Sequence, residues 1–215
     1  PELALGLDDK SEDIQKLTLQ KLGSSSMKKD SSVIAKVEVL VAQKSMNAKL
    51  RAAAIGFLVK NGNSKYEAIY NTYIKDSSFS VAAACLKGLM DLHPEKDMEL
   101  AKQYGKNAGG ALAQLCNETI LKKATEEDFD LVTENFDQMP LAQEKIGMAG
   151  DYADYLDKVK DLNKVKKGID VIIKMRNKIP SAYRKFIDPM MQNMLEPLGK
   201  SKGEEIKQYI EKRME

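Results

Sequence analysis

The chain has 215 residues, of which 31% are charged, and its formal net charge is +2. This balance excludes a strong overall field that would draw the chain to nucleic acid or to anionic lipid. Uninterrupted apolar runs are far shorter than the roughly 20 residues that a membrane-spanning helix needs, so we expect no membrane among its partners.

The first seven residues lack the basic start and the long apolar centre of a signal peptide. They are typical of the end of an interrupted helix, so we expect the chain to be a fragment of a larger protein. The location of that protein stays open between the cytoplasm and an exported form, periplasmic or extracellular.

Apolar residues at three-and-four spacing predict helices along the whole chain. The expected helices cover 11–22, 30–43, 47–61, a helix that begins at Ser64, 78–93, 94–107, 111–123, 126–139, 141–157, 162–178, 181–198 and a last helix that begins after Ser201. Asn61-Gly62-Asn63 ends the third of these, and Pro94 suits a first helical position.

Several helix starts carry residues that can bind free backbone N–H groups. The predicted caps are Ser11, any of Asp30, Ser31 and Ser32, and three capping boxes, Ser64 with Glu67, Thr125 with Asp128, and Ser201 with Glu204.

The helices recur about every 31 residues as far as Pro140. Leu50, Val81 and Leu112 lie 31 residues apart at equivalent positions of successive first helices. Three columns at this spacing are entirely apolar: Leu19, Leu50, Val81 and Leu112; Leu22, Ala53, Ala84 and Leu115; Met27, Leu58, Leu89 and Ile120. Second helices align through Ile69, Leu100 and Leu131, with Val37 one place out of register.

One helical hairpin cannot bury its apolar face alone, so successive hairpins must stack and share a core. We therefore predict an all-α fold, a right-handed superhelix (α-solenoid) of antiparallel helix pairs like HEAT and armadillo repeats. The breaks between helices are short, which predicts a single repeat domain over residues 1–215.

Few residues suit a catalytic or metal site. His93 is the only histidine, which excludes multi-histidine metal sites, and its place before Pro94 indicates a helix end. Cys85 and Cys116 share one column and are predicted to be small buried core residues. The segment 105–110 follows a helix and lacks the Gly-Lys-Ser/Thr ending of a phosphate loop. We identify no catalytic or metal-binding residue and no cofactor in this chain.

Two segments carry strongly biased charge. Residues 126–139 contain acidic residues and no basic one, which we interpret as a solvated helix face. Residues 158–185 hold ten Lys or Arg against two Asp. Such a run can neutralise phosphates, with Tyr183 stacking on a base. Its lysines alternate with an apolar stripe, which favours an exposed helix face or a contact with an acidic surface of another domain. Met190, Met191 and Met194 are predicted to pack in the core rather than to form a partner groove.

The alanine-rich first helices, Lys49-Leu50-Arg51-Ala52-Ala53-Ala54 and Ser80-Val81-Ala82-Ala83-Ala84, resemble those of HEAT-type repeats. The order of the whole chain resembles the C-terminal helical domain of bacterial zinc aminopeptidases of the aminopeptidase N family. Gly6-Leu7-Asp8-Asp9 and the segment from Ile179 to Pro189, IPSAYRKFIDP, carry the rest of this resemblance.

The resemblance implies a parent protein that removes N-terminal residues from peptides, with zinc held by a His-Glu-x-x-His helix and a downstream glutamate. These ligands are absent here, so the zinc belongs to the catalytic domain of the parent. This piece is then a non-catalytic cover that packs on that domain and shapes the access of peptide substrates. Tyr70, Tyr73 and Tyr104 are candidates for a substrate-facing or partner-binding surface, because second helices are expected to line the concave face.

Two alternatives remain open. The chain can be a free-standing HEAT-like scaffold that binds another protein. A nucleic-acid-binding helical repeat ranks third, and it predicts binding that weakens steeply with salt and that needs Lys164, Lys166 and Lys167.

Overall fold

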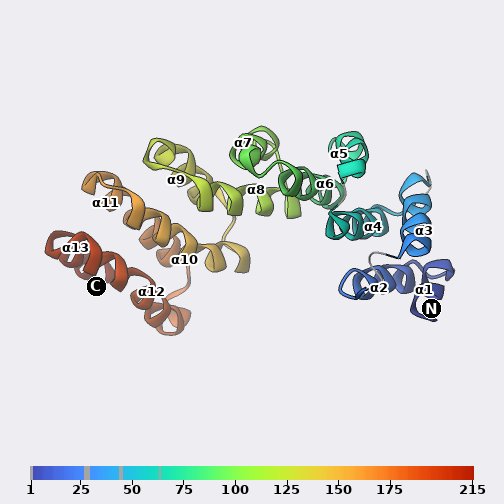
Figure 1. The fold of residues 1–215 in the computed structure, drawn as a ribbon. Coiled ribbons are helices and arrows are strands. Elements are labelled where there is room, and N and C mark those ends of the chain that lie inside the picture. Colours follow the sequence, from blue (N-terminus) through green and yellow to red (C-terminus); the bar gives the residue numbers. More distant parts are fainter. Residues whose placement is uncertain (1, 27–29, 44–45, 63) are drawn as a thin grey trace. The chain divides into compact units, whose positions relative to one another are not determined.

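The computed structural model describes residues 2–26, 30–43, 46–62 and 64–215, and within these ranges every regular element is a helix. Met27 and Asn63, which belong to the sequence pattern above, lie outside the described residues. The all-α prediction is therefore confirmed for the part of the chain that the structure describes. Figure 1 shows the helices in chain order.

The chain divides into two compact units, Pro1–Cys116 (unit 1) and Asn117–Glu215 (unit 2). The division falls within helix α8 (Gly110–Lys123). Each unit has its own set of buried apolar side chains.

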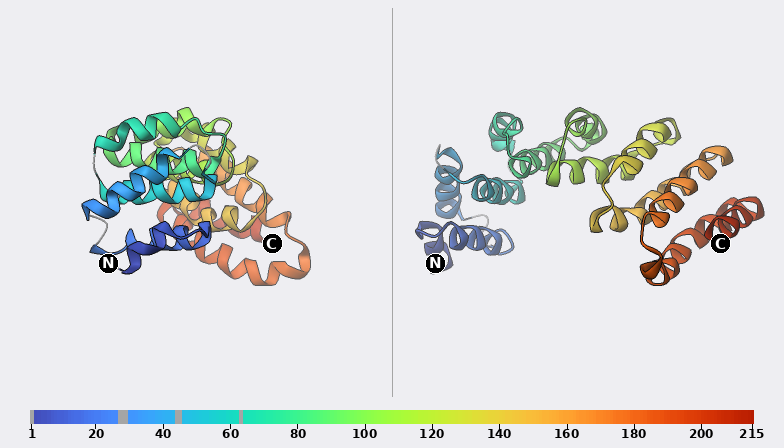
Figure 2. Two further views of the ribbon diagram at one scale, coloured as in Figure 1. Left: turned by 90° about the vertical axis from the view of Figure 1, so that its right-hand side faces the viewer. Right: turned by 180° about the vertical axis from the view of Figure 1, so that it is seen from behind.

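Unit 1 is built from short helices joined by tight turns. Its helices before α8 are α1 (Glu2–Leu5), α2 (Glu12–Leu22), α3 (Ser31–Ala42), α4 (Ala48–Asn61), α5 (Glu67–Tyr73), α6 (Phe79–Leu92) and α7 (Asp97–Gly105). Helix α4 contacts α2, α3 and α6, and α6 also contacts α5 and α7. The first helices α2, α4 and α6 thus follow one another by direct contact, and the second helices α3 and α5 each contact the first helix that comes next in the chain, α4 and α6 (Figures 1 and 2).

Helix boundaries confirm the 31-residue spacing for α4, α6 and α8 but not for α2, which begins at Glu12, 36 residues before α4. Helices α4, α6 and α8 begin at residues 48, 79 and 110, two steps of 31. The apolar column that begins with Leu19 is buried throughout, with exposed fractions of 1% for Leu19, 4% for Leu50, 0% for Val81 and 6% for Leu112. A short 3₁₀ turn precedes each of three second helices, at Ser64–Tyr66, Pro94–Lys96 and Glu126–Asp128.

The predicted column of the second helices is wrong. Ile69 and Leu100 are only half-buried, and Leu131 is exposed. The buried positions lie elsewhere, at Tyr66 and Tyr70 before and within α5, and at Phe129, Val132 and Phe136 in α9 (Phe129–Gln138). The 31-residue spacing of the first helices does not hold for the second helices. With their 3₁₀ turns, the second helices start at residues 64, 94 and 126, at intervals of 30 and 32 residues.

Two of the predicted caps are confirmed by their hydrogen bonds. The carboxylate of Asp30 accepts from the backbone N–H groups of Ser32 and Val33 at 2.8 and 3.4 Å. Thr125 and Asp128 form the predicted capping box, in which the Asp128 carboxylate accepts from the Thr125 N–H at 3.0 Å.

The other predicted caps are wrong. Ser11 precedes α2 but makes no side-chain cap bond, and Ser64 lies inside a 3₁₀ turn. Ser201 lies inside a long helix, where its hydroxyl bonds to the carboxylate of Asp157. That helix ends at Gly203, whose φ of +90° favours glycine over any side chain.

Unit 2 contains the longer helices, α9, α10 (Gln143–Lys158), α11 (Leu162–Asn177), α12 (Ser181–Lys202) and α13 (Glu204–Met214). Helices α9, α11 and α13 follow one another along one side, and α10 and α12 lie along the other (Figure 1). In the core the rings of Phe136 and Tyr152 stack with centroids 4.3 Å apart. The Tyr152 hydroxyl donates to Thr133 Oγ1 at 3.0 Å, which satisfies a buried polar group.

Candidate functional site

The three predicted surface tyrosines lie in different environments in unit 1. Tyr70 is 1% exposed, and burial raises its pKa above the ordinary value. Its ring lies against Gly88, where an added Cβ would be 2.6 Å from Cε2 of Tyr70. Tyr73 and Tyr104 are half-buried. The sequence predicted an exposed surface position for Tyr70. The structure shows instead that Tyr70 is a core residue.

Tyr73 belongs to a polar junction around Arg51 that the sequence did not predict. The Arg51 guanidinium lies 5.2 Å from the centre of the Tyr73 ring and donates to the Gln43 carbonyl at 2.8 Å. It also lies 3.7 Å from the carboxylate of Asp76. The Tyr73 hydroxyl donates to the Val41 carbonyl at 3.3 Å. These contacts hold the end of α3, the start of α4 and the end of α5 together, so Tyr73 has a structural role.

Ion pairs and hydrogen bonds also link neighbouring hairpins in unit 1. Glu38 of α3 accepts from the Tyr66 hydroxyl at 2.8 Å and pairs with Lys65 at 2.7 Å. Both bonds lower the pKa of Glu38, and the Lys65 bond contributes most. At the end of α6, His93 Nε2 lies 2.8 Å from the carboxylate of Glu67. His93 is the C-cap of α6, as predicted, and its Nε2 contact joins the end of α6 to α5.

In unit 2 the acidic helix α9 and the basic helix α11 pair with each other. Lys167 Nζ lies 3.0 Å from the carboxylate of Asp130, and Lys174 Nζ lies 2.7 Å from that of Asp137. The hydrogen bond from Lys174 lowers the pKa of Asp137. The acidic face of α9 and of the turn before it is solvated at Glu127, Asp130 and Glu134, as predicted. It is also an acidic surface that the basic run meets within the same unit.

Glu126 makes a further link between these helices. Its carboxylate accepts from the backbone N–H groups of Lys160 and Asp161, each at 3.0 Å, just before the start of α11. These bonds lower the pKa of Glu126. Negative charge is favourable at this position because the N-terminal end of a helix carries a partial positive charge. Lys164 Nζ also approaches Glu126, donating to its carbonyl at 3.3 Å.

Helix α11 is tied to α13 in the same way. Lys166 Nζ lies 2.6 Å from the carboxylate of Glu205, and the carboxylate of Asp170 lies 3.0 Å from Arg213. The Tyr209 hydroxyl donates to Asp170 at 2.9 Å. Lys164, Lys166 and Lys167 thus all have intrachain acceptors. A bound phosphate would have to compete with those acceptors, which weakens the nucleic-acid alternative.

The core of unit 2 contains a lysine that the sequence analysis missed. Lys145 is 2% exposed, and its ammonium donates to the carbonyls of Asp137 and Met139 at 2.9 and 3.0 Å. It lies 5.1 Å from the centre of the Phe136 ring. Burial lowers the pKa of Lys145. The cation satisfies carbonyls at the end of α9, where the helix dipole favours positive charge.

The segment that carries the family resemblance, from Ile179 to Pro189, is fixed by two arginines. Arg176 forms two hydrogen bonds to the Asp188 carboxylate, of 2.6 and 2.9 Å. Arg184 donates to the carbonyls of Ile179 and Asn177 at 3.0 and 2.9 Å. The start of α12 is therefore held against the end of α11 by guanidinium groups.

The α12 surface differs from the expectation. Met191 is fully buried, as predicted, whereas Met190 is 37% exposed and does not pack in the core. Tyr183 and Phe186 are also exposed. These three residues lie three and four positions apart and share one side of the helix.

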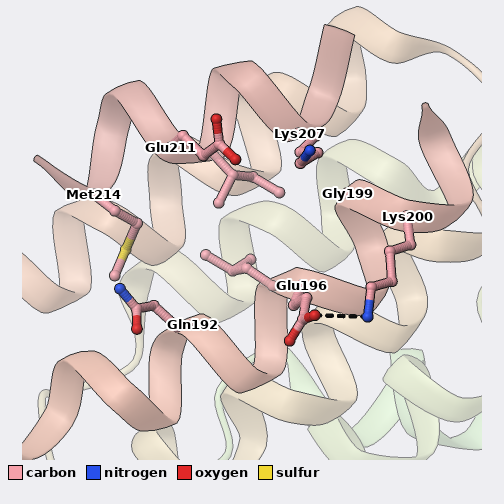
Figure 3. A pocket seen from close by; sticks show the side chains of 9 residues that line it. Gln192, Glu196, Gly199, Lys200, Lys207, Glu211 and Met214 are labelled. Atoms are coloured by element: carbon pink, nitrogen blue, oxygen red, sulfur yellow. Dashed lines mark ion pairs between the residues drawn. The ribbon is translucent and has the colours of Figure 1, made fainter. Parts of the chain in front are cut away.

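A groove runs between α12 and α13 and has a volume of about 380 Å³. Leu195 and Ile210 form its apolar floor, and both are buried. Figure 3 shows Glu196 and Lys200 on its α12 rim, paired at 2.6 Å. The α13 rim carries Lys207, Glu211 and Met214. Opposite charges alternate around this rim, so the groove suits an apolar side chain more than a small charged ligand.

Reactive groups are few in the part of the chain that the structure describes. No three His, Cys, Asp or Glu side chains there come together as a metal site. Cys85 and Cys116 are buried free thiols, as predicted, and burial raises their pKa values to about 12 and about 11. Thiols with such pKa values stay protonated and unreactive at neutral pH. No described helix has both the length and the apolar character to cross a bilayer.

Comparison of the sequence with models of protein families, with curated proteins and with solved structures gives no match.

Proposed function

We propose that the chain is a non-catalytic helical-repeat domain that packs on the catalytic domain of a zinc aminopeptidase and shapes the access of its peptide substrates. In this proposal the helix pairs stack into a right-handed HEAT-like solenoid, and residues 1–215 act as one array. The zinc and the reacting groups belong to the catalytic domain of the same polypeptide. The parent is then a metallopeptidase, and the peptide is its substrate.

One observation supports the stacked-repeat part of the proposal. The alanine-rich segments on which the resemblance rests lie in α4 and α6, and these two helices pack against each other. Ala54 and Ala82 are 0% and 2% exposed. Small side chains at such a contact allow helix axes to approach closely, as stacked repeats require.

The electrostatics of unit 2 support a structural role. Its strongest charge bias, the basic run in α11, is matched by carboxylates of α9 and α13. Charges that pair between neighbouring helices add to the cohesion of the unit and leave little field for a charged ligand.

The direct test begins with the reading frame upstream of the codon for Pro1. A segment that encodes His-Glu-x-x-His a few hundred residues earlier is expected. The parent should then be produced with and without this chain, and its kcat/KM compared on a short and a long peptide. We expect zinc in both forms and a changed ratio of the two kcat/KM values when the chain is removed.

The isolated chain provides the control. We expect no stoichiometric zinc by metal analysis and no zinc-dependent hydrolysis of aminoacyl substrates, because the ligands are absent from the sequence. Stoichiometric zinc or metal-dependent activity in the isolated chain would refute the proposal.

A free-standing HEAT-like scaffold is the second candidate. The exposed Tyr183, Phe186 and Met190 on α12 favour it, because exposed apolar side chains that cluster on one face commonly mark an interaction site. An upstream reading frame without a peptidase segment would favour this candidate over the accessory domain.

A further inference from the structure

Helix α12 carries an uncharged stripe that the core of unit 2 does not use. It consists of exposed residues at alternating spacings of three and four: Tyr183, Phe186, Met190, Asn193 and Pro197. Tyr183, Phe186 and Met190 are 62%, 67% and 37% exposed. A spacing of three and four along 15 residues is the spacing by which one helix pairs with another.

The opposite side of α12 makes the contacts of the unit. Met191, Leu195 and Leu198 are buried there, and α12 packs on α10, α11 and α13. The N-terminal part of the stripe is fixed in place, because Asp188 on the same helix is held by Arg176. The stripe is therefore a preformed ridge on an anchored helix, which lowers the entropic cost of binding a partner.

The charges beside the stripe indicate what that partner is. Lys185 and Glu196 lie on the same flank of the stripe, five positions before and six positions after Met190. In an antiparallel pair of identical helices with a two-fold axis near Met190, Lys185 of each copy faces the partner's Glu196. Tyr183 then faces the partner's Pro197, and the two Met190 side chains meet. A two-fold interface must be complementary to itself. This arrangement is so both in its charges, Lys185 against Glu196, and in its uncharged stripe.

The side chains beside the stripe are compatible with the pairing. Glu196 bonds to Lys200 through one carboxylate oxygen, at 2.6 Å, so its other oxygen can accept from Lys185 of the second copy. Lys185 Nζ lies 5.0 Å from the centre of the Phe186 ring, beside the stripe. The Lys185 ammonium therefore lies where the second helix would pass.

We propose that two copies of the chain associate through antiparallel pairing of α12 along this stripe. The inference concerns the chain itself and does not rest on the proposed function. One helix pair buries less surface than the roughly 1,200–2,000 Å² of a stable interface, so the dimer is expected to be weak, with a dissociation constant on the order of 10 μM.

Charge reversal tests both the surface and the orientation. Lys185→Glu alone places two acidic residues opposite each other, and Glu196→Lys alone places two lysines opposite each other. Each variant should dimerise at least about tenfold more weakly than the original chain. An equimolar mixture restores opposite charges at both contacts and should recover dimerisation to within about threefold, as should the double reversal in one chain. Sedimentation velocity over a concentration series measures all four.

Controls separate association from folding. Lys122→Glu changes the net charge equally at an exposed position of α8 and should leave the dimer unchanged. Phe186→Ser should abolish dimerisation while circular dichroism stays unchanged. A chain that stays monomeric up to about 200 μM, twenty times the expected dissociation constant, would overturn the proposal. So would single reversals that dimerise like the original chain, or a mixture that fails to recover.

Discussion

The guanidinium of Arg176 and the carboxylate of Asp188 meet in two hydrogen bonds, of 2.6 and 2.9 Å, and join α11 to the first half of α12. The Arg176 side chain is 11% exposed and that of Asp188 is 28% exposed. Arg176 lowers the pKa of Asp188 through this hydrogen bond. Paired geometry and partial burial make this contact different from the exposed ion pairs of the chain.

Asp188→Asn should lower the free energy of unfolding by about 1–3 kcal/mol, because a largely buried guanidinium loses its charged acceptor. Asp91→Asn is a matched control, since the Lys87–Asp91 pair is exposed and should contribute less than about 0.5 kcal/mol. Urea unfolding followed by circular dichroism measures both. Equal losses in the two variants would contradict the importance of the Arg176 contact.

Gly88→Ala should destabilise unit 1 by about 1–3 kcal/mol. The added Cβ would lie 2.6 Å from Cε2 of Tyr70, and the buried ring has little room to move. Gly56→Ala is the control, because an added Cβ there meets nothing within 4 Å. That change should stabilise α4 by about 0.5–1 kcal/mol. Thermal unfolding should therefore shift in opposite directions, and a shift in the same direction would show that Tyr70 packs differently.

Lys145→Met should lower the free energy of unfolding by about 1–3 kcal/mol, since two carbonyls at the end of α9 lose a charged donor. Lys174→Met, which removes an exposed cation that pairs with Asp137, should cost no more than about 1 kcal/mol.

The difference in the free energy of unfolding between the original chain and Lys145→Met should depend on pH, with a definite sign. Burial lowers the pKa of Lys145 in the folded chain, so the unfolded chain binds more protons between that pKa and the usual 10.5. The original chain should therefore gain stability relative to Lys145→Met as pH rises through this window. Chemical unfolding of both proteins across alkaline pH tests this, and an unchanged difference would argue against a buried ammonium.

Acid should destabilise unit 2 through Glu126. The pKa of Glu126 is lowered from its usual 4.5 by hydrogen bonds from the Lys160 and Asp161 N–H groups. Its contribution is therefore present above pH 4.5 and is lost as pH falls through the lower folded pKa. Glu126→Gln should show a smaller fall in melting temperature between pH 6 and pH 3 than the original chain, with Glu127→Gln as the neighbouring control. Identical slopes would mean that this carboxylate does not bind the start of α11.

Nucleic acid should bind weakly. The candidate lysines already contact Glu126, Glu205 and Asp130. Fluorescence anisotropy with single-stranded and duplex oligonucleotides at physiological salt should give a dissociation constant no tighter than the non-specific range of about 10⁻⁴–10⁻⁶ M. Neutralising Lys164, Lys166 and Lys167 together should change the melting temperature of the chain. It should change the dissociation constant measured by anisotropy only slightly. Tight binding that the triple variant abolishes would reverse this conclusion.

Some local signals in the sequence predicted local structure correctly. Asp30 and the pair Thr125–Asp128 cap helices because their partners lie two or three residues away. Helix α4 stops at Gly62, whose φ of +68° is easy only for glycine. The pair Ser201 and Glu204 failed because Gly203 sets the break, and the chain before it stays helical.

Contacts between hairpins were not predictable in the same way. The partner of Lys167 is Asp130, 37 residues earlier, and nothing near Lys167 in the sequence indicates it. Lys145 and Arg51 have the composition of exposed positions, yet both are held by carbonyls of earlier turns. The count of basic residues along the sequence therefore overestimated how many cations of α11 lack an acidic partner.

The ladder of ties in unit 2 has a mechanical consequence. Asp130 with Lys167 and Lys166 with Glu205 each join one helix only to the next helix on the same side. Under tension applied at its two ends, we expect such a unit to give way one hairpin at a time, because each helix packs only on its near neighbours. Force traces from unit 2 would then show several small steps in place of a single large one.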